Sequence, residues 1–308
     1  MKTRAFSLRE AAKSIWPCLA VLALCLQAAG APPRLEVFHK ARALQPGEVI
    51  FFDVRSGAPL AQLEARAFGR IFPLYEDGSP GLWRGLVGID LETGPGRHMV
   101  LLDGTDAEGN AVRADYELTV RRKVFPVRRI SVDEKYVTPP PEVQERIRRE
   151  SEKVGRIYGT TRPERLWKGA WVMPVPGPVI SEFGKRSIIN GQPRSPHAGT
   201  DFRGETGAPV RAVNRGRVVL AEDLYFSGNT IILDHGHGLY TYYAHLSRRQ
   251  AKEGEEVAAG DIIGRVGATG RVTGPHLHLS VRLVQARVDP ISLLAVMRPS
   301  REAGSSRK

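Results

Sequence analysis

Six of the eight histidines in this chain of 308 residues lie between residues 197 and 278, which is the strongest chemical signal in the sequence. Zinc centres in hydrolases use three protein ligands, drawn from histidine, aspartate and glutamate, and keep one position open for water. The same stretch contains Asp201, four residues after His197. The side chains for such a centre are therefore present, and the elements around them must decide which ones meet.

Two of these histidines are separated by one residue, in Gly274-Pro-His-Leu-His-Leu-Ser280. Because side chains alternate along a strand, His276 and His278 would share one face, and the two leucines would point to the other. The apolar face would anchor the strand in the core. We therefore predict a strand that presents two imidazoles to a cleft.

An even spacing also separates His197 from Asp201, in Ser195-Pro-His-Ala-Gly-Thr-Asp-Phe202. On a strand these two side chains would share a face, and Gly199 between them would leave space above it. This segment predicts a second part of a metal site. His245 lies in Tyr242-Tyr-Ala-His-Leu246, where the alternation indicates an ordered strand end.

A rival pair, His235 and His237, occurs in Asp234-His-Gly-His-Gly238, directly after the strand-like run Thr230-Ile-Ile-Leu233. Its two glycines are typical of a turn. We expect these two rings to project into solvent and to bind no metal, because a loose loop holds zinc poorly.

Taken in order, the motifs resemble those of the lysostaphin/LytM-type zinc metallopeptidases, which cleave peptidoglycan peptides. The likeness covers essentially the whole of residues 171–295. It rests on these segments: Ser181-Glu-Phe-Gly-Lys-Arg186, His197-x-x-x-Asp201, Gly207-Ala-Pro-Val210, Tyr243-Ala-His-Leu246, Gly267-Ala-Thr-Gly270, Gly274-Pro-His-Leu-His278 and Val288-Asp-Pro290.

The resemblance implies that His197, Asp201 and His278 bind one Zn²⁺ per chain, and that His245 and His276 are catalytic histidines beside the metal. It also implies a β-rich peptidase fold of the duplicated hybrid motif type. Many relatives have an acidic residue two positions after the last histidine, where this chain has Ser280. We expect this difference to tune the surroundings of the metal rather than to abolish binding.

The first 31 residues have the order of a secretory signal peptide: a basic start, an apolar run from Ile15 to Leu26, and the small-residue cleavage site Ala29-Gly30-Ala31. The apolar run is short for a membrane span, so we expect cleavage and no stable span afterwards, and an uncleaved N-terminal anchor is the alternative. Both cysteines, Cys18 and Cys25, lie in this segment. The protein is therefore predicted to be exported, and to be periplasmic or associated with the cell envelope.

The rest of the chain predicts an all-β protein with a helical connector. Short alternating strands and turn signals over residues 34–123 indicate an Ig-like β-sandwich, and residues 124–170 form a linker. The linker has a charged helix over Glu142 to Ile157, which Thr138 or its neighbours can cap. Residues 171–295 form the metallopeptidase domain, and residues 296–308 a basic tail that we expect to be disordered.

Three functions remain open from the sequence. The first is a zinc endopeptidase that hydrolyses peptide cross-links or stem peptides of peptidoglycan. The second is a catalytically inactive relative that activates another cell-wall hydrolase, although such proteins usually lose ligands, and all five positions are filled here. The third is a nucleic-acid binder, suggested by a net charge of +12. The signal peptide and the lack of a basic recognition motif argue against nucleic acid, and an anionic wall suits the charge equally well.

Overall fold

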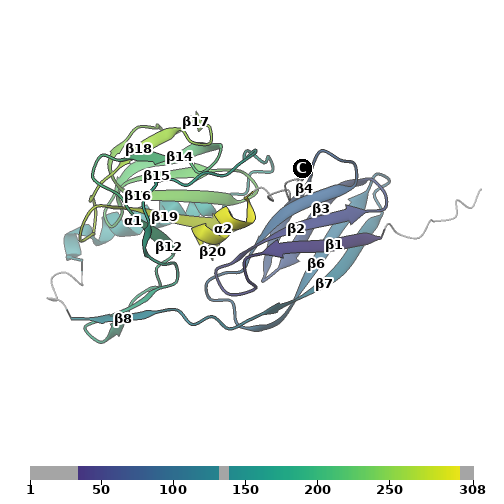
Figure 1. The fold of residues 1–308 in the computed structure, drawn as a ribbon, viewed down its shortest axis with the longest axis horizontal. Coiled ribbons are helices and arrows are strands. Elements are labelled where there is room, and N and C mark those ends of the chain that lie inside the picture. The colour runs from purple at the N-terminus through teal and green to yellow at the C-terminus, as the bar shows by residue number, and fades with distance from the viewer. Residues whose placement is uncertain (1–33, 132–138, 299–308) are drawn as a thin grey trace, which may run out of the picture. The chain divides into compact units, whose positions relative to one another are not determined.

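The computed structural model describes residues 34–131 and 139–298 and consists mostly of strands, which confirms the all-β prediction (Figure 1). The predicted signal peptide, Thr138 and residues 299–308 of the predicted tail lie outside the described residues. Seven strands come first: β1 (Leu35–Ala41), β2 (Val49–Ser56), β3 (Leu60–Ala67), β4 (Arg70–Glu76), β5 (Leu82–Gly88), β6 (Gly96–Asp106) and β7 (Ala111–Val120).

These seven strands form a two-layered sandwich in the order β1-β2-β5-β4-β3-β6-β7. Strand β4 belongs to both layers, since its first half pairs with β3 and its second half, from Leu74, pairs with β5. Alternation supplies the core: Ile50, Phe52 and Val54 of β2 are fully buried. The predicted β-sandwich is therefore confirmed.

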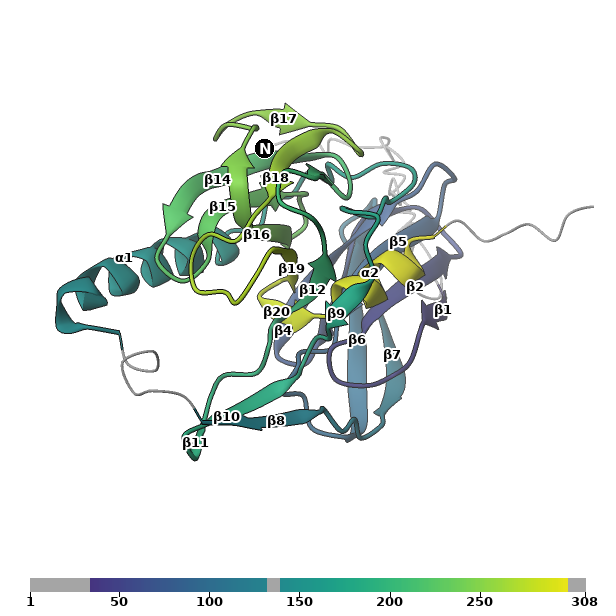
Figure 2. The same ribbon diagram turned by 60° about the vertical axis from the view of Figure 1, so that its left-hand side comes forward.

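The segment that follows the sandwich contains a strand as well as the predicted helix. Strand β8 (Val127–Ile130) pairs in parallel with β10 (Arg186–Ile189), which pairs with β11 (Gln192–Pro193). Helix α1 (Pro141–Tyr158) begins after Pro140, which makes no side-chain capping bond. Figure 2 shows α1 beside β14 and β15, and β8 beside β10.

The remaining strands form a ten-stranded antiparallel sheet with the central order β17-β14-β15-β16-β19-β12-β9, while β18 pairs with β13 and β16, and β20 pairs with β19. Helix α2 (Pro290–Val296) follows the last strand. The strands are β9 (Val179–Ser181), β12 (Gly199–Arg203), β13 (Pro209–Arg211), β14 (Gly216–Leu224), β15 (Gly228–Asp234), β16 (Leu239–Arg249), β17 (Glu256–Val257), β18 (Ile262–Val266), β19 (His276–Leu283) and β20 (Ala286–Val288).

The two faces of strand β19 differ in the way that the sequence predicts. Leu277 and Leu279 are buried in the core, while His276 and His278 are only partly buried on the opposite face. Helix α1 packs on that same face farther along the sheet. Its apolar contacts join Val154, Ile157 and Tyr158 of α1 to Leu220, Leu224, Ile232 and Tyr240 of the sheet.

Charged side chains join the sandwich to the end of the second sheet. Arg42 donates hydrogen bonds to Glu48 and to Asp289, which is the N-cap of α2. Arg287 of β20 donates to Asp90 after β5. The described residues after the predicted signal peptide therefore belong to one compact unit, and the domain limits given above stay a prediction.

Within the part of the chain that the structure describes, neither helix has the length and apolar character that a membrane-spanning helix needs.

Candidate metal centre and active-site groove

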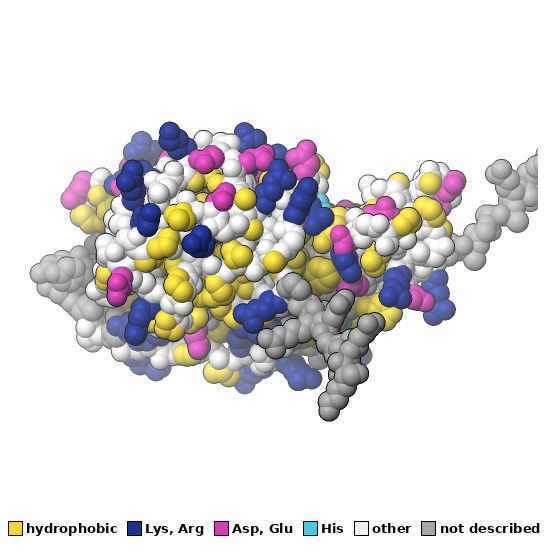
Figure 3. All heavy atoms as spheres, turned by 45° about the horizontal axis from the view of Figure 1, so that its top comes forward, with side chains coloured by type: hydrophobic (Ala, Val, Ile, Leu, Met, Phe, Trp, Pro, Cys, Tyr) yellow, Lys and Arg dark blue, Asp and Glu magenta, His cyan; other side chains and the backbone are white. Residues whose placement is uncertain are grey.

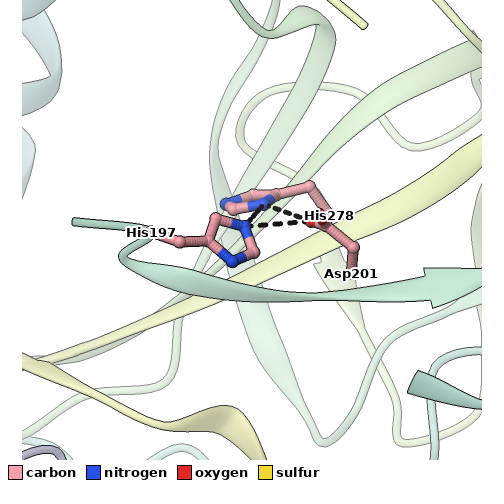
Figure 4. A group of neighbouring side chains, drawn as sticks. All are labelled: His197, Asp201 and His278. Atoms are coloured by element: carbon pink, nitrogen blue, oxygen red, sulfur yellow. Dashed lines mark hydrogen bonds and ion pairs between the residues drawn. The ribbon is translucent and has the colours of Figure 1, made fainter. Parts of the chain in front are cut away.

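Three side chains that the resemblance identified converge on one point (Figure 4). The Nε2 atom of His197 lies 3.1 Å from Oδ1 of Asp201 and 3.0 Å from Nδ1 of His278, and the latter two atoms are 2.8 Å apart. Asp201 and His278 are direct partners in the register of β12 and β19. Two imidazoles and one carboxylate at these separations fit a tetrahedral zinc ion, whose N and O ligands lie about 2.0–2.2 Å from the metal.

His197 reaches this point from the loop before β12 rather than from the strand, so the expectation of a shared strand face was wrong for this residue. Its Nδ1 atom lies 3.0 Å from the carbonyl oxygen of Glu182, and its backbone N–H donates to the carbonyl of Lys185. A ring whose Nδ1–H donates to a carbonyl leaves the lone pair of Nε2 for a metal. The loop before β12 therefore orients the ring of His197, which lies outside the strand.

Gly199 makes the space that the sequence predicts. A Cβ atom at this position would lie 2.5 Å from Cε1 and 2.6 Å from Nε2 of His278. It would also lie 2.5 Å from the carbonyl oxygen of Leu279. Real Cβ atoms do not approach other atoms this closely, so any other residue would displace the ring or the backbone of β19. The glycine is therefore required by the packing of His278 between the two strands.

His245 and His276 lie beside this group, with their ring centroids 4.9 Å apart. The Nδ1 atom of His245 lies 2.9 Å from the carbonyl oxygen of Thr269, and that of His276 lies 2.9 Å from the carbonyl oxygen of Gly274. Each ring can thus donate through Nδ1 and keep Nε2 as an acceptor. His245 lies within β16 rather than at its end, and it has a left-handed φ of 62°. Such backbone strain is typical of functional positions.

Burial and charge set the protonation of the group. Burial alone would raise the pKa of Asp201, but hydrogen bonds from His197 and His278 outweigh it and hold that pKa below its ordinary value. Burial lowers the pKa of His278. Burial also lowers the pKa of His245 to about 4, so this ring is neutral at pH 7. Burial would lower the pKa of His197, but its hydrogen bond to Asp201 outweighs burial and raises that pKa. Metal binding requires an anionic aspartate and neutral ligand histidines, so an ion would displace any proton that His197 and Asp201 share.

These five side chains line one groove of about 390 Å³. Among the described residues, six more line the groove: Phe226, Ser227, Tyr242, Arg271, Val272 and Thr273. None of them was predicted from the sequence as a site residue. Tyr242 could not be found from the sequence, because its place on this face depends on its pairing with Ser280 of β19, and simple alternation would put it on the face opposite His245, three residues later. Phe226 and Ser227 come from the β14–β15 turn, and no local pattern predicts their approach.

The expectation that His235 and His237 project into solvent was wrong. Both are buried, and the Nδ1 atom of His235 lies 2.7 Å from the carbonyl oxygen of Arg215. The loop is covered by the segment after α1, because the N–H of Leu166 donates to the carbonyl of His235 and the N–H of His237 donates to the carbonyl of Arg162. The two rings are not part of the groove.

Comparison with known proteins places these motifs in a family. Residues 195–290 match the model of Peptidase family M23. The peptidoglycan DD-endopeptidase ShyA of Vibrio cholerae is 45% identical over 84 residues, which are 27% of this chain and 20% of that protein. The DD-carboxypeptidase/endopeptidase Mpg of Neisseria meningitidis is 41% identical over 97 residues, which are 32% of this chain and 22% of that protein. The match thus spans about a fifth of the length of these curated relatives.

A solved structure agrees over most of the chain. A crystal structure from Pseudomonas aeruginosa, described as a peptidase M23, is 31% identical and superposes with a TM-score of 0.65. The likeness covers 83% of this chain and 97% of that one, so it extends well beyond the segment that matches the family model. With the histidine and aspartate motifs gathered in the segment that matches the family model, the chain belongs to peptidase family M23.

Proposed function

We propose that the protein is a zinc-dependent endopeptidase that hydrolyses peptide cross-links or stem peptides of bacterial peptidoglycan. His197, Asp201 and His278 would hold one Zn²⁺ per chain. The observation that supports this most strongly is the convergence of these three ligand atoms, within 4.8 Å of one another, beside two further histidines in an open groove. A site that had lost its chemistry would not be expected to keep all five side chains oriented.

The three ligands and the two neighbouring histidines have separate tasks in this proposal. A bound zinc ion supplies Lewis-acid chemistry, which polarises a peptide carbonyl and lowers the pKa of a water molecule. His245 and His276 hold Nδ1 against backbone carbonyls, which leaves Nε2 of each ring to exchange a proton. One ring can accept the proton of the attacking water, and the other can hydrogen-bond the developing oxyanion or protonate the leaving amine.

The substrate class is supported by the relatives and by charge. One of the curated relatives is named a peptidoglycan DD-endopeptidase and the other a DD-carboxypeptidase/endopeptidase, and this chain has a formal net charge of +12. Figure 3 shows Lys and Arg side chains spread over one face of the molecule rather than gathered in one patch. A broadly basic surface favours attraction to an anionic wall polymer. Export through the predicted signal peptide would bring the enzyme to the periplasm or cell envelope.

Muropeptide release tests this function. Purified sacculi are treated with the full chain, with the chain plus chelator, and with chelated chain to which zinc is returned, and the soluble products are identified by mass spectrometry. We expect release of peptide fragments that chelator stops and zinc restores. Release of no fragment by a protein that contains stoichiometric zinc would contradict the proposal and favour the inactive activator.

A further inference from the structure

A second cavity, of about 360 Å³, adjoins the active-site groove. Phe226, Ser227 and Tyr242 line both, so the two share a wall. Its other side is formed by α1, through residues that include Ile147 and Val154. The helix therefore ends the groove and creates a pocket beside the proposed metal centre, of a size that suits one or two residues of a ligand.

Arg282 contributes the positive charge of this pocket, and Glu150 contributes a negative one. Arg282 follows His278 by four residues on β19, so its side chain leaves the same face of the sheet. Its Nη1 atom is buried and has no hydrogen-bond partner among the described residues. The guanidinium carbon lies 5.3 Å from the ring of Tyr158, whose aromatic face packs against the charge without neutralising it.

The carboxylates near Arg282 are already engaged elsewhere. Asp90 accepts two hydrogen bonds from the Arg287 side chain, with Nη2–Oδ1 at 2.7 Å and Nε–Oδ2 at 3.1 Å. Glu150, which also lines the pocket, accepts from Arg146 Nε at 2.6 Å and from the backbone N–H of Tyr225 at 2.8 Å. Within the part of the chain that the structure describes, no acid forms an ion pair with Arg282.

A buried N–H group of arginine without a hydrogen-bond partner lowers the stability of the folded chain. Such a group is therefore expected mainly where it has a function. Arginine stays charged in proteins, and the Arg282 side chain is partly buried, so its enclosed Nη1–H group has neither water nor a protein acceptor. The neighbouring Arg287, which has a structural role, forms ion pairs with two carboxylates. Arg282 differs from it in having none among the described residues. Exceptions of this kind are expected at functional sites. The guanidinium is therefore available for an anion that enters from the groove.

We propose that Arg282 and the pocket beneath α1 bind a carboxylate of the peptide substrate. This inference rests on the proposed function and specifies the substrate: a peptide with an acidic group that extends from the metal centre along β19 towards Arg282, whose backbone lies about 13 Å from that of His278. The planar guanidinium can bind both oxygens of a carboxylate, which an amide would not match. The acidic group is either the C-terminal carboxylate or an acidic side chain.

Calorimetric binding to chelator-treated full chain tests this without turnover. The probes are a stem tetrapeptide with free carboxylates, the same peptide fully amidated, and two peptides amidated only at the C-terminus or only at the side chains. We expect the free peptide to bind about tenfold more tightly than the fully amidated one. The singly amidated peptides identify which carboxylate is recognised. Equal binding of the free and fully amidated peptides would overturn the inference.

Variants separate recognition from folding. Arg282→Met should remove the preference for the carboxylate while its melting temperature stays equal to or above that of the wild type, because no ion pair or hydrogen bond is lost and the methionine side chain can still pack on Tyr158. Arg282→Lys should keep part of the preference, and Arg217→Met, at an exposed position of β14, should keep all of it. Retained preference in Arg282→Met, or a lower melting temperature with preference intact, would overturn the inference.

Failure of the Arg282 pocket can be distinguished from failure of the proposed endopeptidase function. Absent carboxylate preference with normal muropeptide release would reject the pocket and leave the endopeptidase. Clear preference with no release under any condition would reject the endopeptidase and leave a peptide-binding pocket.

Discussion

The two His-x-His pairs of this chain lie in different environments. His276 and His278 lie on one face of β19 beside Asp201, and their rings line an open groove. His235 and His237 lie in a loop that the segment after α1 covers, and His235 places Nδ1 and Nε2 within 2.7 Å of protein oxygens. A His-x-His pattern alone therefore does not make a metal site. A metal site also needs a carboxylate close to the rings, and ring nitrogens that are not already hydrogen-bonded to protein groups outside the site.

The largest expected effect comes from replacing the second histidine of each pair. His278→Ala removes a ligand atom from the centre, so we expect zinc content to fall to background and muropeptide release to fall by more than 100-fold. The matched variant, His237→Ala, should keep both, because its ring lies outside the groove. Inductively coupled plasma mass spectrometry and product analysis measure the two effects. Full zinc occupancy in His278→Ala would refute this ligand assignment.

A smaller loss is expected from Gly199→Ala. The added methyl group would lie 2.5 Å from Cε1 of His278 and would push that ring from its place, so we expect zinc affinity to fall about 10- to 100-fold. Competition with a fluorescent chelator measures the affinity. Gly94→Ala is the control, since a Cβ atom there meets nothing within 4 Å. Equal affinity of Gly199→Ala and wild type would show that the ring can move without cost.

The buried histidines His235 and His237 should affect the stability of the fold, whereas His276 and His278 in the groove should affect activity and metal binding. Burial lowers the pKa of His235 from 6.5 to about 4, so the unfolded chain binds a proton below pH 6.5 that the folded chain rejects. The contribution to stability is complete above pH 6.5 and is lost as the pH falls towards 4, by about 3 kcal/mol. Urea unfolding between pH 7.5 and 4 measures this slope. His235→Gln should show a shallower slope, and parallel curves would contradict the assignment.

The smallest effect is expected at His237, whose ring packs against Trp167 and Tyr75 with centroids 5.5 and 5.9 Å away. Its Nδ1 atom is buried and has no partner in the described structure. His237→Phe keeps the aromatic contacts and removes the unsatisfied nitrogen, so we expect the free energy of unfolding to change by less than about 1 kcal/mol. Denaturant titration measures the change. A loss above 3 kcal/mol would show that the imidazole itself is required.

The sequence could predict what alternation and glycine chemistry control. The shared face of His276 and His278, the space at Gly199 and the all-β architecture follow from local patterns. It could not predict contacts between distant segments. His197 is held by the carbonyl of Glu182, and the cover over His235 comes from the segment after α1. Strand β8 was missed because its partner, β10, lies far along the chain.

The same limit applies to Arg282. Alternation from His278 puts it on the face of the groove, and this could be read from the sequence. That α1 covers the position and closes a pocket around it depends on packing of Tyr158 against Tyr240, whose ring centroids are 5.6 Å apart. A charged helix with a thin apolar stripe does not reveal which surface it covers.

Anomalous diffraction at the zinc edge, from crystals of the full chain grown with zinc, tests the central claim most directly. We expect one strong peak per chain between Nε2 of His197, Nδ1 of His278 and a carboxylate oxygen of Asp201, and none at His235 or His237. A peak at the buried pair, or no peak at the three convergent residues when zinc is present in excess, would contradict it.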